Sequence, residues 1–351
     1  MEKEKQFDIK KYHQTLCPNP PDFLNDYLGT PSVQHLAGVG LLCGTDWTPL
    51  FKNRFFYSRL DHSLGVALII WNFTHDKKQT LAGLFHDIST PNFSHVMDFK
   101  NGDTLVQEST ESLTAKIINE DITLSQKLFS EGIYKYEIDN YHRYAIADND
   151  IPGLCADRLE YMFPSGAILC DNWNNDSIAK VYSEVRVLQN EHGLAELGFK
   201  DLEAAVEYTK KYLEVSKILQ MNEDKLSMQM LADVVARALE CGFVTEDDLY
   251  TVREKDMILL FDRIADTSAD EKFTKLWHTF RQMTKVIHTE EPMENSYCIS
   301  LDVKKRFVNP LVGQDALLPS RRVSELSPEA DECIKEFLAY KDSRYGCVPW
   351  L

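Results

Sequence analysis

The sequence predicts a predominantly α-helical protein with a small β element near its C-terminus. Apolar residues recur at helical spacing along most of the chain, and one such helix face joins His62, Val66, Ile69 and Phe73. Residues 297–303 instead alternate between apolar and polar side chains, which is typical of a strand. With 351 residues, 44% of them hydrophobic and 26% charged, the chain can bury a core as one large or two smaller domains.

The first part of the chain is polar and contains several prolines. We interpret residues 1–29 as an N-terminal segment, because Thr30-Pro31 then has the cap-and-proline order that begins a helix. A first short helix is predicted over residues 32–42, followed by a loop. The next helix is predicted to open at Arg59 and to point His62 inward. A lone histidine on an apolar face is more often a core residue bonded to a carbonyl group, so this alternative stays open for His62.

An apolar helical segment over residues 81–88 ends with His86 and Asp87 side by side. Two titratable groups that close an apolar helix are costly to desolvate without a partner, and a metal ion suits both. One turn earlier, Ala82 and Gly83 are small enough to let another helix approach closely. The segment therefore predicts a metal site at the end of a closely packed helix.

A third histidine, His95, begins a new element soon after this doublet. A helix is predicted over residues 110–119, and Glu108 and Glu111 stand at its start, where carboxylates interact favourably with the helix dipole. These residues are candidates for groups close to the metal site.

Another buried helix is predicted over residues 154–162, and Pro164 is expected to end it. Asp157 and Tyr161 lie one turn apart on one face of this helix. A buried aspartate needs a charged or hydrogen-bonding partner. Its partner is either a metal ion or an arginine, for which Arg158 and Arg143 are the candidates.

Beyond residue 171 the pattern indicates packing helices. They are predicted over residues 176–190, 202–221 and 225–240, with a further helix start at residues 246–250 and continued periodicity to about residue 288. A small sheet is predicted around residues 297–308, and a last helix over residues 328–339. Two basic clusters, Lys304-Lys305-Arg306 and Arg321-Arg322, are either solvated cations or a phosphate-binding or partner-binding rim over the active site.

Four residues in three separate blocks carry a specific resemblance. The histidine in RLDHSLGVA, the doublet in LAGLFHDIS and the aspartate in CADRLEYM resemble the H…HD…D signature of the HD-domain metal-dependent phosphohydrolases. The surrounding residues, including Arg59 and the Phe93-Ser94-His95 block, are similar to the deoxynucleoside triphosphate triphosphohydrolase branch of that superfamily. The match covers roughly residues 30–162. In this chain the signature residues are His62, His86, Asp87 and Asp157.

The resemblance implies an all-α HD-domain core with a helical extension and a small C-terminal β element. It implies that His62, His86, Asp87 and Asp157 bind one divalent metal ion. Two imidazoles and two carboxylates suit iron, manganese, zinc, nickel or magnesium, and the ligand types do not choose among these metals. A bound ion would activate water for attack on phosphorus.

The same resemblance implies roles for residues around the metal. Asp87 or Glu108 would accept a proton from the attacking water, and His95 would protonate the leaving oxygen or hold a phosphate. Arg59 would face the phosphates, with a structural salt bridge to Asp61 or Glu160 as the alternative. Tyr161 would flank the substrate or only pack in the core, and Arg158 is a further candidate for substrate binding.

The sequence departs from the triphosphohydrolase pattern at positions whose residues recognise the nucleotide in that branch. Thr90 stands where that branch has a second histidine, Gln107 where it has a catalytic one, and Leu41 where it has a sugar-contacting glutamine. Ser165 replaces an acidic residue after the final tyrosine. We therefore expect a metal-dependent phosphohydrolase that cleaves a phosphate ester of a nucleotide or a related small molecule. The alternative is a catalytically inactive HD-fold protein that binds metal or senses a ligand.

The composition limits which partners and which cellular location are expected for the protein. The net charge of −17 disfavours binding to nucleic acid or anionic membranes, and the longest apolar run, residues 64–71, is too short to span a bilayer. The eight cysteines include no CxxC pair, which favours reduced thiols and a cytoplasmic location. The expected partner is a small phosphorylated substrate, and a homo-oligomer stays compatible with the sequence.

The domain organisation follows from these segments. Residues 30–175 are expected to form the metal-binding core, and residues 176–292 a helical extension packed on it. Residues 293–351 are expected to form a small α+β C-terminal region.

Overall fold

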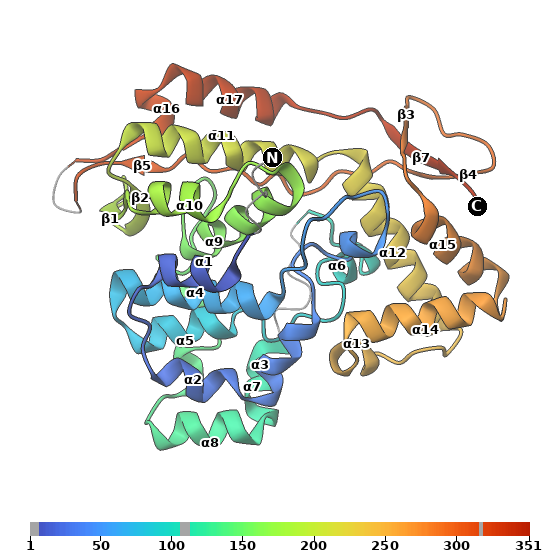
Figure 1. Ribbon diagram of the computed structural model, residues 1–351, viewed down its shortest axis with the longest axis horizontal. Coiled ribbons are helices and arrows are strands. Elements are labelled where there is room, and N and C mark those ends of the chain that lie inside the picture. Colours follow the sequence, from blue (N-terminus) through green and yellow to red (C-terminus); the bar gives the residue numbers. More distant parts are fainter. Residues whose placement is uncertain (1–6, 106–112, 316–318) are drawn as a thin grey trace, which may run out of the picture.

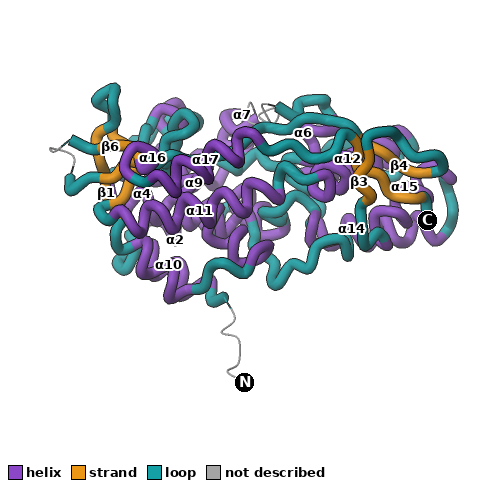
Figure 2. The backbone as a smooth tube through the Cα atoms, turned by 90° about the horizontal axis from the view of Figure 1, so that it is seen from above, coloured by secondary structure: helices purple, strands orange, loops and turns teal. Residues whose placement is uncertain are grey.

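The computed structural model describes residues 7–105, 113–315 and 319–351. Helices make up most of the molecule, and two small sheets lie at opposite ends of its long axis (Figures 1 and 2). The prediction of a mostly helical core is confirmed. In the described ranges, no helix combines the length and the apolar character needed to cross a membrane.

The N-terminal part is more helical than predicted. Three helices come before the metal-site helices: α1 (Ile9–Leu16), α2 (Phe23–Leu28) and α3 (Pro31–His35). Tyr12 and Leu16 of α1 are completely buried. The predicted first helix over residues 32–42 begins within one residue of the observed start at Pro31, but its predicted end is wrong, because α3 ends at His35 and a 3-10 turn covers Leu36–Gly38. It ends early because Gly38 and Gly40 are poor helix formers, and Gly40 pairs instead with the backbone of Ser58.

The central pair of helices is present, but the second one is shifted: it begins four residues before the predicted 81–88 segment and ends at Phe85, so His86 and Asp87 follow it. Helix α4 (Arg59–Thr74) begins at a capping box between Ser58 and Asp61, and α5 (Lys77–Phe85) packs against it. Gly83 is the point of close approach, because a Cβ atom there would lie 2.3 Å from Cδ1 of Ile70. The pair is followed by α6 (Val96–Lys100), α7 (Thr114–Glu120) and α8 (Ile122–Ser130). Glu108, Gln107 and Glu111 lie outside the described residues.

Helix α9 (Ala156–Ser165) runs past the proline that was expected to end it. Pro164 has no N–H group to donate to the carbonyl oxygen of Glu160. The hydroxyl of Tyr12 donates to that oxygen instead, at 3.2 Å, so the buried carbonyl keeps a partner. The chain then continues into a π-helical turn over Gly166–Cys170.

The predicted helix over residues 176–190 is only half correct. Helix α10 (Asn175–Tyr182) is followed by strand β1 (Val185–Gln189), which pairs antiparallel with β2 (Ala195–Phe199). Val185 and Val187 favour a strand, and the turn at Gly193 has the positive φ that reverses the chain. β2 also pairs with β5 (Leu311–Val312), and β5 pairs with β6 (Arg321–Arg322).

The helices that follow agree with the apolar periodicity. They are α11 (Leu202–Ile218), α12 (Asn222–Glu240), α13 (Asp248–Thr251), α14 (Glu254–Asp266) and α15 (Glu271–Gln282). Helices α12, α14 and α15 build a second hydrophobic cluster around Trp277 and Phe261, beside the larger cluster of the N-terminal half. Both clusters flank the site described below.

The C-terminal part forms the second sheet and a long return across the molecule (Figure 1). Its strands are β3 (Ile287–Thr289), β4 (Ser296–Ile299) and the central β7 (Tyr345–Pro349). The predicted strand ends at Ile299, so residues 300–310 are not part of a strand. Helix α16 (Val323–Leu326) precedes α17 (Pro328–Ala339), which has the predicted bounds.

The prediction that all cysteines are reduced is wrong for one pair. Cys298 of β4 and Cys347 of β7 face each other on neighbouring strands and form a disulfide. They are 49 residues apart in the sequence, so only the strand pairing reveals them as neighbours. The other six cysteines are free.

Candidate metal centre

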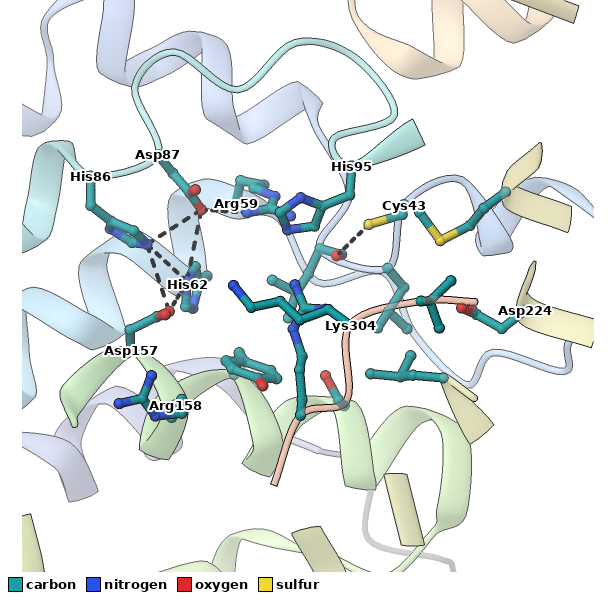
Figure 3. A pocket seen from close by; sticks show the side chains of 18 of the residues that line it. Cys43, Arg59, His62, His86, Asp87, His95, Asp157, Arg158, Asp224 and Lys304 are labelled. Carbon is teal, nitrogen blue, oxygen red and sulfur yellow. Dashed lines mark hydrogen bonds and ion pairs between the residues drawn. The ribbon is translucent and has the colours of Figure 1, made fainter. Parts of the chain in front are cut away.

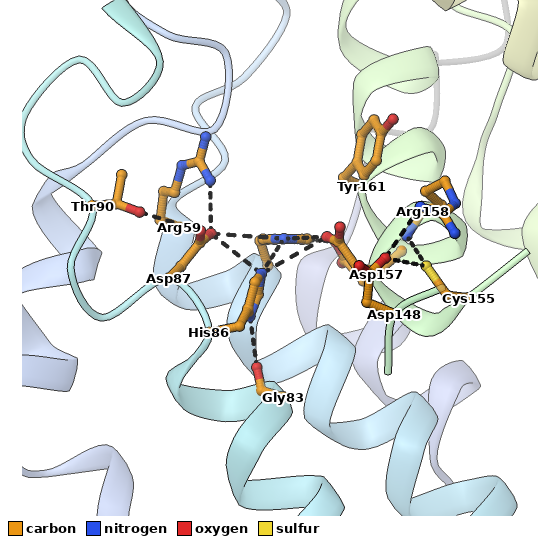
Figure 4. Close-up of polar contacts among 12 residues, drawn as sticks. Arg59, Gly83, His86, Asp87, Thr90, Asp148, Cys155, Asp157, Arg158 and Tyr161 are labelled. Carbon is orange, nitrogen blue, oxygen red and sulfur yellow. Dashed lines mark hydrogen bonds and ion pairs between the residues drawn. The ribbon is translucent and has the colours of Figure 1, made fainter. Parts of the chain in front are cut away.

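Four predicted ligands meet at the junction of three helices (Figure 4). His62 comes from the first turn of α4, His86 and Asp87 follow the end of α5, and Asp157 lies in the first turn of α9. The Nε2 atom of His62 lies 3.2 Å from Nε2 of His86, 3.1 Å from Oδ1 of Asp157 and 3.7 Å from Oδ2 of Asp87. The Nε2 atom of His86 lies 3.6 Å from Asp87 and 3.8 Å from Asp157.

These separations fit one metal ion. Metal bonds of about 2.1 Å put neighbouring ligand atoms about 3.0 to 3.4 Å apart, close to the distances observed. The ligand atoms of His62, His86 and Asp87 all lie within 4.8 Å of one another. Asp157 is not part of this group of three, but its Oδ1 lies 3.1 Å from Nε2 of His62 and 3.8 Å from Nε2 of His86, so it adds a second carboxylate oxygen beside both rings.

The outer nitrogens of both imidazoles are already engaged. Nδ1 of His62 donates to the carboxylate of Glu160 at 2.5 Å, and Nδ1 of His86 donates to the carbonyl oxygen of Gly83 at 2.7 Å. The Nε2 atoms of the two rings therefore face each other at 3.2 Å. A shared proton or a bound cation can occupy the point between them, and a cation there would bind both nitrogens.

Neighbouring charges shift the pKa values of Asp87 and His62 strongly. Burial alone would raise the pKa of Asp87, but the positive charge of Arg59 and those of the two histidines hold that pKa well below its ordinary value. Burial lowers the pKa of His62, but Glu160 and Asp157 outweigh burial and raise that pKa to about 10. Burial raises the pKa of Asp157, but His62 and His86 outweigh burial and lower that pKa to about 2. Asp87 and Asp157 are therefore both ionised and able to bind a cation at neutral pH.

Arg59 lies beside the metal ligands, as predicted. Its Nη1 donates to Oδ2 of Asp87 at 2.7 Å, and its Nε donates to the hydroxyl of Ser94 at 2.9 Å. The alternative partners, Asp61 and Glu160, are used elsewhere: Asp61 caps α4 and Glu160 binds His62.

His95 lines the same pocket and is held by a carboxylate. Its Nδ1 donates to Asp98 at 2.9 Å, which leaves Nε2 as the ring atom available to a ligand. Burial lowers the pKa of His95, and the charge of Arg59 lowers it further, although the hydrogen bond to Asp98 acts in the opposite direction. Figure 3 shows His95 on the same side of the pocket as Arg59.

Tyr161 and Arg158 also line the pocket, but their polar groups have protein partners. The hydroxyl of Tyr161 lies 2.9 Å from that of Tyr212. The guanidinium of Arg158 binds Asp148 at 3.1 Å and the carbonyl oxygen of Gly153 at 2.9 Å. Arg158 is therefore anchored to the preceding loop rather than paired with Asp157, and Asp157 contacts the two histidines instead.

The two basic clusters of the C-terminal part have different positions. Lys304 and Arg306 line the pocket, and Figure 3 shows Lys304 extending into it from the segment that crosses the opening. Arg321 pairs with Glu325, whereas Arg322 binds Glu191 and Glu196 beside the first sheet. Neither Arg321 nor Arg322 lines the pocket, so the hypothesis of a rim over the site is supported only for the first cluster.

Sequence reasoning missed three residues of the site. Glu160 orients His62, Asp98 orients His95, and Asp224 lies in the opposite wall of the pocket. Glu160 and Asp98 each stand three residues from a predicted site residue, which places them one helical turn away and is a signal that could have found them. Asp224 stands far along the chain in α12, and no local pattern connects it to the metal ligands.

Among the residues that depart from the triphosphohydrolase pattern, three are close to the site. The hydroxyl of Thr90 donates to Oδ1 of Asp87 at 3.2 Å, and Leu41 and Ser165 line the pocket. Gln107 lies outside the described residues, as does Glu108, the predicted proton acceptor.

No family model matches the chain. The metal-dependent phosphohydrolase cns2 of Cordyceps militaris is 22% identical over 295 residues, which cover 83% of this chain and 81% of that protein. The uncharacterised protein YdhJ of Bacillus subtilis is 28% identical over 142 residues, which cover 39% of this chain and 41% of that protein.

Two solved structures share the fold. A phosphohydrolase from Bacteroides thetaiotaomicron superposes with a TM-score of 0.63 at 14% identity, over 95% of this chain and 97% of that one. A hypothetical protein from Aquifex aeolicus gives a TM-score of 0.60 at 15% identity, over 94% of this chain and 92% of that one. The shared fold, the similarity to a protein named as a metal-dependent phosphohydrolase and the gathering of the H…HD…D residues in one place all support the resemblance to the HD-domain phosphohydrolases.

Proposed function

We propose that the protein is a metal-dependent phosphohydrolase that cleaves a phosphate ester of a nucleotide or a related small molecule. The observation that carries this proposal is the convergence of the two imidazoles, whose Nε2 atoms lie 3.2 Å apart, with the carboxylates of Asp87 and Asp157, which lie 3.1 to 3.8 Å from these nitrogens. The relative named as a metal-dependent phosphohydrolase and the solved phosphohydrolase of the same fold support it.

His62, His86, Asp87 and Asp157 would hold one divalent ion. The mixed nitrogen and oxygen set suits iron, manganese, zinc, nickel or magnesium. Such an ion lowers the pKa of a bound water molecule and polarises a phosphoryl oxygen. Because Arg59 is already paired with Asp87, its charge lies next to the position where negative charge on the phosphate would increase.

The other pocket residues have roles that their contacts support. Arg59 keeps Nη2 available for a phosphate oxygen, since Nη1 and Nε bind Asp87 and Ser94. His95, held through Nδ1 by Asp98, would give a proton from Nε2 to the leaving oxygen or bind a phosphate. Asp87 or Glu108 would accept the proton of the attacking water, and Tyr161 and Arg158 would flank the bound substrate.

The test is a screen of purified protein, loaded with each candidate metal, against phosphate monoesters, phosphodiesters and nucleoside triphosphates. We expect turnover of at least one ester class with at least one metal, and its loss in Asp87→Ala. The matched control is Asp266→Ala, at an exposed position at the end of α14. Turnover that survives in Asp87→Ala would refute the site, and stoichiometric metal without any turnover would support a metal-binding or ligand-sensing protein instead.

A further inference from the structure

The wall of the pocket opposite the metal ligands contains a buried carboxyl group. Asp224 lies in the first turn of α12, is only 6% exposed, and faces the pocket from the side away from His86 and Asp157 (Figure 3). Within the described part of the chain, no group donates a hydrogen bond to its carboxylate. A carboxyl group this deeply buried is costly to leave without a partner, so its position points to a ligand.

The neighbouring charges do not replace that partner. Burial raises the pKa of Asp224 to about 7, and the positive charges of Arg306 and Lys225 lower it only in part. Arg306 lines the same pocket, where its field also reaches His95 and Tyr161. The charge of Arg306 thus acts on Asp224, but among the described residues no hydrogen bond or ion pair joins the two side chains.

Apolar side chains make up a large part of the pocket lining, and they are Leu41, Cys43, Phe99, Leu219, Met228 and Val303. Met228 stands one helical turn after Asp224 in α12, and Figure 3 shows Cys43 on the Asp224 side of the metal ligands. The imidazoles, the other carboxylates and Arg59 lie at the metal end. The pocket therefore has a polar end that suits a phosphate, and apolar side chains next to the carboxyl group of Asp224.

We propose that Asp224 determines specificity for the organic group of the substrate, which is a phosphate ester of a largely apolar ring system that presents an amino group to this carboxylate. The inference rests on the proposed function, because it assigns the phosphate to the metal end. An amino group supplies the N–H donor that Asp224 lacks, and the rings cover the apolar wall. A second phosphate at this end would instead face the carboxylate of Asp224.

The test compares esters that differ only in an amino group. One pair is adenosine 5′-monophosphate and purine riboside 5′-monophosphate, and the other pairs are 1-naphthyl phosphate with each of its amino-substituted isomers. For the wild type we expect kcat/KM to be about tenfold or more higher for the amino-bearing member of at least one pair. In Asp224→Leu this ratio falls to near one, mainly through a higher KM for the amino-bearing ester.

Two further variants make the result decisive. Asp224→Asn keeps the size of the side chain and its place in the helix, so it reduces the ratio even if Asp224→Leu disturbs α12. Asp266→Asn, outside the pocket, keeps the full ratio, and melting temperatures establish that each variant is folded. A ratio near one in the wild type, or one that is unchanged in both folded Asp224 variants, would overturn the inference.

A different result is expected if the protein is not a hydrolase. If the wild type hydrolyses no ester, hydrolysis is refuted, and calorimetric binding of the same ester pairs then decides the role of Asp224. Tighter binding of an amino-bearing ester by the wild type, lost in Asp224→Leu and Asp224→Asn, supports the subsite. Equal binding of both members of every pair overturns it.

Discussion

The Nδ1 atom of His62 lies 2.5 Å from the carboxylate of Glu160, which is completely buried. The other carboxylate oxygen of Glu160 accepts a hydrogen bond from Tyr57 at 2.6 Å, so the carboxylate is held from two sides. This pair links α4 to α9 and turns Nε2 of His62 toward the metal centre. Partners of this kind set the tautomer and orientation of a ligating histidine and strengthen metal binding.

Replacing Glu160 by glutamine is expected to weaken divalent metal binding by about 10- to 100-fold, because the charge that supports His62 is lost. A titration against a competing chelator measures this affinity. Tyr57→Phe is the matched control, since it removes the other hydrogen bond to Glu160 and leaves His62 paired. Unchanged metal affinity in Glu160→Gln would show that Glu160 has no role in orienting the ligand.

Gly65 of α4 should not tolerate a larger side chain. A Cβ atom at this position would lie 2.4 Å from Oε1 of Glu160, which His62 and Tyr57 hold in place. Gly65→Ala is therefore expected to lower the free energy of unfolding by about 1–3 kcal/mol and to weaken metal binding. Chemical denaturation measures the first effect. In Gly29→Ala, where a Cβ would meet nothing within 4 Å, we expect no comparable loss, and equal stability of the two variants would contradict this account.

His95 is expected to act as a proton donor to the leaving group in its protonated form, because a neutral ring that donates from Nδ1 to Asp98 has only a lone pair at Nε2. His95→Gln should then reduce kcat by about 10²- to 10⁴-fold for an alkyl phosphate, whose leaving oxygen needs a proton. The reduction should be much smaller for 4-nitrophenyl phosphate, whose leaving group departs as an anion. Asp98→Asn should show the same pattern more weakly, because it only loosens His95. Equal losses for both esters would instead assign His95 to phosphate binding.

His288, which lies outside the pocket, is expected to make the stability of the fold depend on pH. His288 of β3 contacts Glu223 at 2.9 Å and Asp342 at 2.8 Å. The hydrogen bond to Glu223 and that to Asp342 raise the pKa of His288 despite burial. Burial raises the pKa of Asp342, but Asn222 and His288 outweigh burial and lower it.

The direction of this pH dependence follows from the two shifts. A raised pKa in the folded state means that His288 stabilises the fold below its unfolded pKa of about 6.5, and the effect is lost as the pH rises through the folded value. Asp342 stabilises the fold above about pH 4, and its effect is lost at lower pH. Because these groups are partly exposed, His288→Gln should lower the free energy of unfolding by no more than about 1 kcal/mol near pH 5.5, and by less at pH 9. A loss that grows with pH would contradict the assignment, and His192→Gln at an exposed turn is the control.

The sequence predicted those features that depend on local pattern. Helical spacing identified α4, α11, α12 and α17, and the family resemblance pointed to His62, His86, Asp87 and Asp157, which the fold brings together in the candidate metal centre. For the helices, residues close together in the sequence are enough to make the prediction.

What was missed depends on contacts between distant segments. Helix α9 continues through Pro164 because Tyr12, about 150 residues earlier, satisfies the carbonyl group that proline leaves without a donor. Strands β1 and β2 are stabilised by pairing with each other and with β5 rather than by their own residues alone. The disulfide likewise arises only when β4 and β7 pair, and Asp224 reaches the pocket only because α12 packs against α6, more than 100 residues earlier in the chain.

The most direct test of the central claim is the metal content of the purified protein and of single-ligand variants. Elemental analysis after equilibration with each candidate divalent metal and removal of unbound ions should find one ion per chain in the wild type. Asp157→Ala and His86→Ala should each lose most of this ion, whereas Asp266→Ala should keep it. A wild type that retains no divalent ion, or ligand variants that retain it in full, would contradict the assignment of His62, His86, Asp87 and Asp157 as a metal centre.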